Sequence, residues 1–307
     1  MKSFNRFESP GNKDKISDVE RDVFDLMVSE HNDSAIQLAD HEGSYSAEEI
    51  ERDLTAVERK KSKLLQENPE RHKRAVILET VLSEQIELSD WFGKNALTIT
   101  PSEYDDLFHG VDIAAEFKEE GGFKYLAIDI TSSAKAVERK IRKIKEGIRT
   151  GQLTEVKYFS SERNSSPDLP GPLKQLPNAI IGVDSRTIIE LSRIWLEIFK
   201  AKKAKSRESS SNAQDLYAAD IKTAKDKLAR HRVQVLILKE LEKQLEVFSD
   251  FAMEIGRVEV AKKYQYLLKI IGDILRTKNI SKDAEKINNT DDVYTAIEEN
   301  LKNFDSL

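Results

Sequence analysis

The chain has 307 residues, with 49 Lys and Arg against 55 Asp and Glu, so that its net charge is −6. It contains no cysteine, which excludes disulfides, thiolate zinc sites, iron–sulfur clusters and a cysteine nucleophile. No segment approaches the roughly 18 apolar residues of a membrane span, and residues 1–15 lack the apolar stretch of a signal peptide. We therefore expect a cytoplasmic protein without a membrane partner.

The composition favours a helix-rich protein with more than one domain. Charged residues make up 34% of the chain, while glycine and proline number only 12 and 7, a profile typical of helices with long solvated faces. At about 100–200 residues per domain, the length predicts two domains. We expect a helical, partly mobile N-terminal region, an α/β core, a linker and a C-terminal helical hairpin, at residues 1–69, 70–200, 201–213 and 214–307.

Two helices are predicted in the N-terminal region. Apolar residues at helical spacing indicate the first, over residues 16–30. The second is predicted over residues 46–67, where Ser46 is suited to cap the first turn and Glu49 occupies the capping-box position. Its apolar stripe is thin and its other faces are charged, which indicates packing against a single neighbour.

The central segment changes from a helical period to a strand period and back. A helix is predicted over residues 70–92, ended by Gly93. Short apolar runs then predict three strands, the last two joined as a hairpin at Gly121 and Gly122, and an amphipathic helix follows. The predicted elements are strands 96–100, 110–117 and 125–131, helix 134–149, strand 156–159, loop 160–177, strand 179–183, and a helix capped by Ser185. This order favours an α/β (α+β) class, with a mixed central sheet flanked by helices.

Helices are predicted through most of the C-terminal third. The polar, serine-rich segment 201–213 indicates a linker or mobile loop. Beyond it, apolar residues at helical spacing predict an αα-hairpin over residues 214–278, turning at Gly256, and one short helix after residue 279. An exposed stripe of this length would be an apolar patch of the kind that monomers avoid. We expect the hairpin to pack with helix 46–67 beside the core, within one chain or across a homodimer.

Two acids lie inside apolar strands of the central segment. Because side chains alternate along a strand, Asp112 shares one face with Ala114 and Glu116. Asp129 stands in the run Tyr-Leu-Ala-Ile-Asp-Ile of residues 125–130. Burying an unpaired carboxylate costs several kcal/mol, so the pattern predicts a partner or a cation for it.

The order α-β-β-β-α-β, with one acid on the second strand and another on the third, resembles the PD-(D/E)XK, or restriction-endonuclease-like, superfamily. The resemblance covers about residues 70–200. It implies that Asp112 is the first motif acid and Asp129 the second, and that both hold Mg²⁺ (or Mn²⁺) for the hydrolysis of phosphodiester bonds. It also implies a third acid from the preceding helix, for which the helical wheel favours Glu84 over Glu79 and Glu87.

The chain departs from the motif at its lysine. Thr131 stands two residues after the second acid, where the pattern has Lys. Some members of the superfamily supply this lysine from the following helix, and Lys140 is the best placed substitute there, with Lys124 and Lys135 as alternatives. Without a replacement, the fold would bind its target and not cut it.

Positive charge is concentrated on the helix that follows the second acid. Residues 132–149 contain seven Lys and Arg against two Glu. Such a patch suits the phosphate backbone of a nucleic acid, with DNA the expected partner. Residues 200–207 carry a second basic run. The predicted nucleic-acid contacts are Lys135, Arg139, Arg142 and Lys143.

Structural explanations exist for each feature alone. Asp112 could be an acid at a strand end, Asp129 the partner of an ion pair, and Glu84 an ordinary helical glutamate; the basic patch could be a solvated helix face. We expect a metal-dependent nuclease, with Glu84, Asp112, Asp129 and Lys140 as its catalytic residues. The alternative is a catalytically inactive nuclease-fold protein that binds nucleic acid or assembles through its helical arms, and a third is a purely structural helical scaffold.

Overall fold

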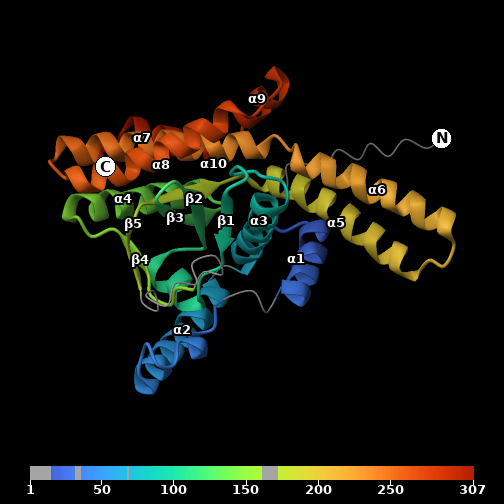
Figure 1. Ribbon diagram of the computed structural model, residues 1–307, viewed down its shortest axis with the longest axis horizontal. Coiled ribbons are helices and arrows are strands. Elements are labelled where there is room, and N and C mark those ends of the chain that lie inside the picture. Colours follow the sequence, from blue (N-terminus) through green and yellow to red (C-terminus); the bar gives the residue numbers. More distant parts are fainter. Residues whose placement is uncertain (1–14, 32–35, 68, 161–171) are drawn as a thin grey trace.

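The computed structural model describes residues 15–31, 36–67, 69–160 and 172–307 (Figure 1). Both predicted N-terminal helices are present, as α1 (Asp18–His31) and α2 (Ala47–Glu67). The hydroxyl of Ser46 accepts a hydrogen bond from the backbone N–H of Glu49 at 3.2 Å, as expected of an N-cap. A short 3₁₀ helix (Leu38–His41) precedes α2. The first 14 residues of the region predicted as partly mobile lie outside the described residues.

A four-stranded mixed sheet forms the centre of the molecule, in the order β1-β2-β3-β6. The first three strands are the predicted antiparallel meander, while β6 runs parallel to β3. A parallel pair needs a crossover connection, and here helix α4 provides it. The elements are α3 (Pro69–Leu88), β1 (Ala96–Ile99), β2 (Ile113–Glu119), β3 (Gly122–Thr131), α4 (Ala134–Thr150) and β6 (Asn178–Gly182).

The strand predicted at residues 156–159 is not part of this sheet. The segment instead forms β4 (Thr154–Val156), which pairs with β5 (Leu173–Leu176) in a separate two-stranded sheet. Residues 160–177 are predicted as a loop, but residues 173–176 form a strand; residues 161–171 lie outside the described part of the chain. The fourth strand of the main sheet is therefore β6.

Side chains alternate across the main sheet as the period of two requires. One face joins the large core, together with buried residues of α3, α4 and the C-terminal helices. The opposite face carries Ala114 and Ala127, which contact Val156 of the small sheet. The residues that face the large core are Ile113, Ala115, Phe117, Leu126, Ile128 and Ile130.

The C-terminal part consists of six helices, and α7 lies directly on the sheet. The predicted linker of residues 201–213 is shorter in the structure, because α5 continues to Arg207 and α6 begins at Ser211, which leaves residues 208–210 between them. The N-cap of α5 is Asp184 and not Ser185, since its side chain accepts from the backbone N–H groups of Arg186 and Thr187. The helices are α5 (Ser185–Arg207), α6 (Ser211–Ala229), α7 (Val233–Glu254), α8 (Val258–Arg276), α9 (Lys282–Asn288) and α10 (Asp292–Lys302).

Side chains of α7 complete the free edge of β6. The Gln244 amide accepts from the Ile180 N–H at 2.8 Å and donates to the Ile180 carbonyl at 2.7 Å. The Glu240 carboxyl accepts from the Gly182 N–H at 3.1 Å, and burial raises the pKa of this carboxyl well above its usual value. These contacts satisfy backbone groups that an uncovered edge strand would leave open to another chain.

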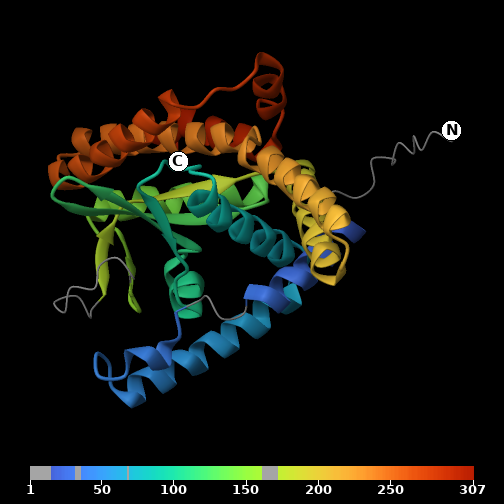
Figure 2. The same cartoon turned by 45° about the vertical axis from the view of Figure 1, so that its right-hand side comes forward.

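The predicted hairpin that turns at Gly256 is present as α7 and α8, which pack together. The first part of the predicted hairpin instead forms α6, which packs with α5 as an arm that projects from the core (Figure 1). Within this chain, α2 does not join the C-terminal helices as predicted: it packs against α3 and residues 105–109, on the opposite side of the molecule from α7 and α8 (Figure 2). None of the described helices is long and apolar enough to cross a membrane.

Candidate active site

The two motif acids meet at the junction of β2 and β3. The Asp112 N–H donates to the Ile128 carbonyl at 2.9 Å, and Ile113 pairs with Ile128 in the sheet. Asp112 and Ile113 thus both lie opposite Ile128, as in a β-bulge, and the regular alternation of the strand ends at Ile113. The Lys140 ammonium forms an ion pair with Asp129 and lies close enough to Asp112 for that charge to raise its pKa, so both acids border the same amine. The backbone N–H of Ile130 donates to the Asp112 carboxylate and fixes its orientation.

Lys140 reaches this site from α4. Its ammonium group forms an ion pair with the Asp129 carboxylate, with the two side chains 16% and 17% exposed, and lies 3.3 Å from the Ile130 carbonyl oxygen. Burial lowers the pKa of Lys140, although Asp112 and Asp106 oppose this effect. Among the lysines considered from the sequence, the structure therefore pairs Lys140 with the second acid.

Thr131, which occupies the position of the motif lysine, has a structural role. The residue is buried, and its hydroxyl accepts from the Ser133 N–H at 3.2 Å. This bond shapes the turn from β3 into α4. The side chain is thus engaged in local structure, and the cation beside Asp129 comes from the helix.

The glutamate beside Asp112 is Glu79 and not the predicted Glu84. The Glu84 carboxylate accepts from the Trp195 indole N–H at 3.0 Å, which holds it toward α5. Burial raises the pKa of Glu79 well above its usual value, and the negative charge of Asp112 raises it further, whereas Lys140 lowers it. The helical wheel separates core-facing from exposed positions, but both glutamates border the core, on different sides of α3.

Asp106 is a fourth acid at the site, and the sequence analysis did not select it. It lies in a π-helix (Asp105–His109), a rare element that is frequent at functional sites. Although the residue borders solvent, burial of its carboxyl raises the pKa of Asp106 well above its usual value. The charge of Asp112, a hydrogen bond to Asp112 and the charge of Glu79 raise it further. The feature of the sequence that could have indicated Asp106 is the pair of adjacent acids at residues 105 and 106, shortly before Gly110.

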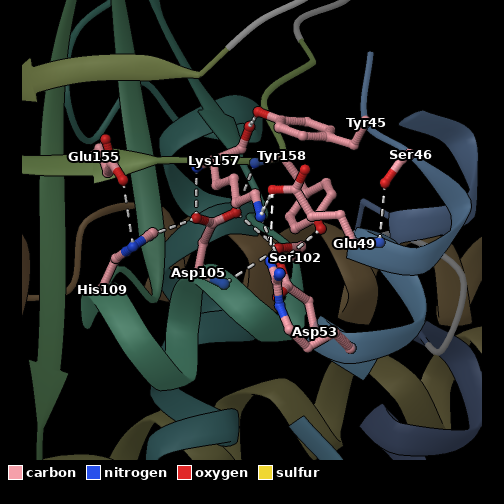
Figure 3. A network of polar contacts seen from close by, with 11 residues as sticks. Tyr45, Ser46, Glu49, Asp53, Ser102, Asp105, His109, Glu155, Lys157 and Tyr158 are labelled. Atoms are coloured by element: carbon pink, nitrogen blue, oxygen red, sulfur yellow. Dashed lines mark hydrogen bonds and ion pairs between the residues drawn. The ribbon is translucent and has the colours of Figure 1, made fainter. Parts of the chain in front are cut away.

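The neighbouring Asp105 anchors the π-helix. Its buried carboxylate accepts from the backbone N–H groups of Lys157 and Tyr158, at 2.6 and 3.0 Å, and from the Ser102 hydroxyl at 2.7 Å (Figure 3). The His109 Nδ1 atom lies 2.8 Å from the same carboxylate. Consecutive acids thus have separate tasks: Asp105 fixes the π-helix to the chain after β4, and Asp106 faces Asp112.

α2 is attached to the same anchor. The Lys157 ammonium lies 2.5 Å from carboxylate oxygens of Glu49 and Asp53, and the Tyr158 hydroxyl donates to Asp53 at 2.9 Å (Figure 3). Burial alone would lower the pKa of Lys157, but its hydrogen bonds to Asp53 and Glu49 raise it above the usual value. The side chain therefore stays charged and holds α2 beside the site.

A cavity of about 790 Å³ adjoins these acids. It lies among α1, α3 and the edge strand β1, and both Glu79 and Asp112 line it. A volume of this size is in the range of ligand-binding clefts. Its other acidic lining residues are Glu84, Glu87, Glu103 and Glu116.

The predicted nucleic-acid contacts lie on the outer face of α4. Lys135, Arg139 and Arg142 are exposed, but Arg142 is bound to Glu138 at 2.7 Å. Lys143 differs from them, because its ammonium group donates to the His109 carbonyl at 3.0 Å and so lies at the acid site. The exposure of this face is as expected; contact with nucleic acid stays a prediction.

The donor chemistry of the site suits a hard divalent cation. Mg²⁺ prefers carboxylate oxygens, and Asp112, Asp129, Glu79 and Asp106 supply them. Burial raises the pKa of both Glu79 and Asp106, and the charge of Asp112 raises both further, whereas Lys140 lowers them. Within the described residues, no group of three acidic or histidine side chains is close enough to hold a metal ion as it stands. Metal binding would therefore require these carboxylates to draw together.

Comparison of the chain with protein-family models, with curated proteins and with solved structures found no match. The chemistry of the site must therefore be argued from its own side chains. The carboxyl groups are those of Glu79 on α3, Asp106 on the π-helix, Asp112 just before β2 and Asp129 on β3, and the ammonium groups are those of Lys140 and Lys143 on α4.

Asp106→Asn should stabilise the protein when no metal is present. A raised folded-state pKa means that the carboxyl contributes stability below its unfolded pKa, and that this contribution is lost as pH rises through the folded pKa. At pH 7–8 in EDTA we expect the melting temperature to rise by about 1–3 °C. Added Mg²⁺ should raise the melting temperature of the wild type more than that of the variant. If Asp106→Asn has a lower melting temperature than the wild type in EDTA, the ionised Asp106 carboxylate does not destabilise the metal-free protein, and this prediction is wrong.

Proposed function

We propose that this protein is a metal-dependent nuclease that hydrolyses phosphodiester bonds of DNA. The observation that carries the proposal is the position of Lys140 between the two motif acids: it pairs with Asp129 and lies close enough to Asp112 for that charge to raise its pKa, and the Asp112 carboxylate accepts from the Ile130 N–H. Glu79 and Asp106 add negative charge at the same place. A structural ion pair alone would explain Asp129 and Lys140, but not three further acids crowded around them.

The arrangement of the elements supports the same proposal. The order α3-β1-β2-β3-α4-β6, with β6 parallel to β3, agrees with the α-β-β-β-α-β order of the PD-(D/E)XK resemblance. The agreement uses β6 as the last strand and treats β4 and β5 as an insertion after α4. Asp112 then lies immediately before the second strand and Asp129 on the third, close to the positions that the resemblance implies.

Each residue has a distinct role in the proposed reaction. Asp112 and Asp129 hold Mg²⁺, with Glu79 or Asp106 as the third acid. When bound, the ion makes water a better nucleophile at neutral pH and offsets the charge that develops on the phosphate. The Lys140 ammonium group donates a hydrogen bond to the Asp129 carboxylate. Its other N–H groups can orient water or a phosphate oxygen.

Lys140→Met tests this assignment against the inactive alternative. With Mg²⁺ present, the wild type should nick or degrade DNA, whereas Lys140→Met should lower kcat by about 100-fold because one preorganised donor is lost. Lys118→Met, an exposed lysine toward the end of β2 that lies away from Asp112, is the control and should change kcat by less than about threefold. Cleavage is followed on duplex DNA, single strands and RNA, with EDTA as the blank.

Two results would count against the proposal. Equal, small losses from both variants would show that Lys140 is no more than a distant phosphate contact. A wild type that cuts no duplex, single strand or RNA would leave the inactive, nucleic-acid-binding alternative, which Thr131 favours because it removes the motif lysine.

A further inference from the structure

Two lysines from helices far apart in the sequence reach the C-terminal end of the π-helix. From α2, the Lys60 ammonium donates to the Leu107 carbonyl and lies 4.3 Å from the centroid of the Phe108 ring. From α4, the Lys143 ammonium donates to the His109 carbonyl at 3.0 Å. The π-helix thus lies between α2 and the sheet, where both amines can approach it (Figure 2).

Neither amine has an anionic partner among the described residues. Lys140 and Lys157 each contact carboxylates, but Lys60 and Lys143 form no ion pair there and donate only to neutral carbonyls. Partial burial lowers the pKa of both amines; Lys143 lowers that of Lys60 and Arg139 that of Lys143, whereas Asp106 and Asp112 raise them. Because neither amine forms an ion pair, an anion that contacts both would give each a charged partner in place of a neutral carbonyl.

Gly110 shows how close these amines are to the acids. A Cβ atom added to this glycine would lie 3.2 Å from the Lys143 Nζ atom and 3.6 Å from an Asp129 carboxylate oxygen. Lys60 is also close enough to Asp106 for that charge to raise its pKa. The site thus has acids inside and unpaired amines at its rim. An anion whose oxygens can contact a divalent cation and two ammonium groups together fits this arrangement, and a phosphate has this chemistry.

We propose that Lys60 and Lys143 form a phosphate-binding pair that holds the DNA backbone beside the carboxylates, so that α2 is part of the substrate-binding surface. This inference rests on the proposed function, because it places the substrate at the same site. The anchor of α2 supports it: Asp53, which binds Lys157, lies seven residues before Lys60 and so on the same face of the helix. The contact that fixes α2 to the core therefore also directs Lys60 toward the π-helix.

The test compares Lys60→Met with Lys61→Met, its neighbour on α2. Lys61 pairs with the exposed Glu103, so the control removes the same charge from the same helix. Binding of a short fluorescent DNA duplex is measured in EDTA, without turnover, at several salt concentrations. Lys60→Met should weaken binding by about five- to tenfold and reduce the slope of log K against log salt by about 0.9, whereas Lys61→Met should change the affinity by less than about twofold.

Two further variants test whether the charge of Lys60 binds the phosphate and whether Lys143 shares it. Lys60→Arg retains the charge and should restore most of the affinity, which separates loss of the cation from damage to the fold. Combining Lys60→Met with Lys143→Met should weaken binding by less than the product of the single effects, because both amines hold one phosphate.

The outcomes separate this inference from the proposed nuclease activity. Equal effects of Lys60→Met and Lys61→Met on binding, in a protein that cuts DNA, would overturn the lysine pair and leave the nuclease proposal standing. Weaker binding by Lys60→Met alone, in a protein that cuts nothing, would support the pair and remove the proposed activity. Failure of Lys60→Arg to restore binding would also overturn the pair.

Discussion

Asp112→Asn should abolish Mg²⁺-dependent cleavage, with a loss of at least about 1,000-fold in kcat. The replacement removes a charged metal ligand, and the loss of groups that merely orient such ligands already costs about 10–100-fold. The fold should survive, because an asparagine carbonyl can still accept the Ile130 N–H that Asp112 accepts. Initial cleavage rates over a Mg²⁺ titration, together with thermal melts, measure both effects.

The choice of residue matters for this experiment. Asp129→Ala should also abolish cleavage, but it leaves the half-buried Lys140 without its carboxylate, so any loss of activity is mixed with a loss of stability. Glu120→Gln, an exposed acid in the turn between β2 and β3, is the control and should cut as the wild type does. Cleavage by Asp112→Asn at the rate of that control would show that Asp112 holds no essential metal.

Deletion of residues 209–307 should prevent the sheet from folding as a soluble unit. α7 buries eight large apolar side chains, seven of them in the large core, at about 1.5–3 kcal/mol each, which together rivals or exceeds the whole net stability of a typical domain. The deletion also uncovers the edge of β6, where Gln244 binds both backbone groups of Ile180. The eight residues are Val233, Val235, Leu236, Ile237, Leu238, Leu241, Leu245 and Phe248.

Soluble yield, dye binding to apolar surface and cooperative thermal melting measure this effect. Leu216→Ser is the matched control, because Leu216 on α6 is 70% exposed and its loss uncovers nothing. That variant should fold and melt as the wild type does. A soluble truncated chain with a sharp melting transition would instead show that the C-terminal helices are an independent module.

Elements with a strong local pattern were predictable from the sequence. The β2–β3 hairpin follows from two alternating runs around Gly121 and Gly122, which adopt φ values of 90° and 128° that favour glycine. α4 follows from its apolar spacing and from Gly151 at φ 77°. Asp112 and Asp129 could also be selected as candidates from these two strands, whereas the position of Asp112, which lies with Ile113 opposite Ile128, breaks the strand period and was not predictable.

The remaining acids and the partners of the strands were decided by contacts between segments far apart in the sequence. Glu79 and Glu84 lie on one helix, and only the positions of the sheet and α5 determine which of them meets Asp112. Asp106 faces the site because Asp105 is held by backbone groups more than 50 residues away.

The pairing of the strands and the ends of the helices also depended on tertiary contacts. A short apolar strand can pair with several others, and here β6 joins β3 while β4 joins β5. The basic half of the segment predicted as a linker continues α5 to Arg207, where it packs along α6, and residues 208–210 connect the two helices. Local periodicity therefore predicted β2, β3 and most of the helices, whereas tertiary packing determined the strand partners and the side chains that surround Asp112 and Asp129.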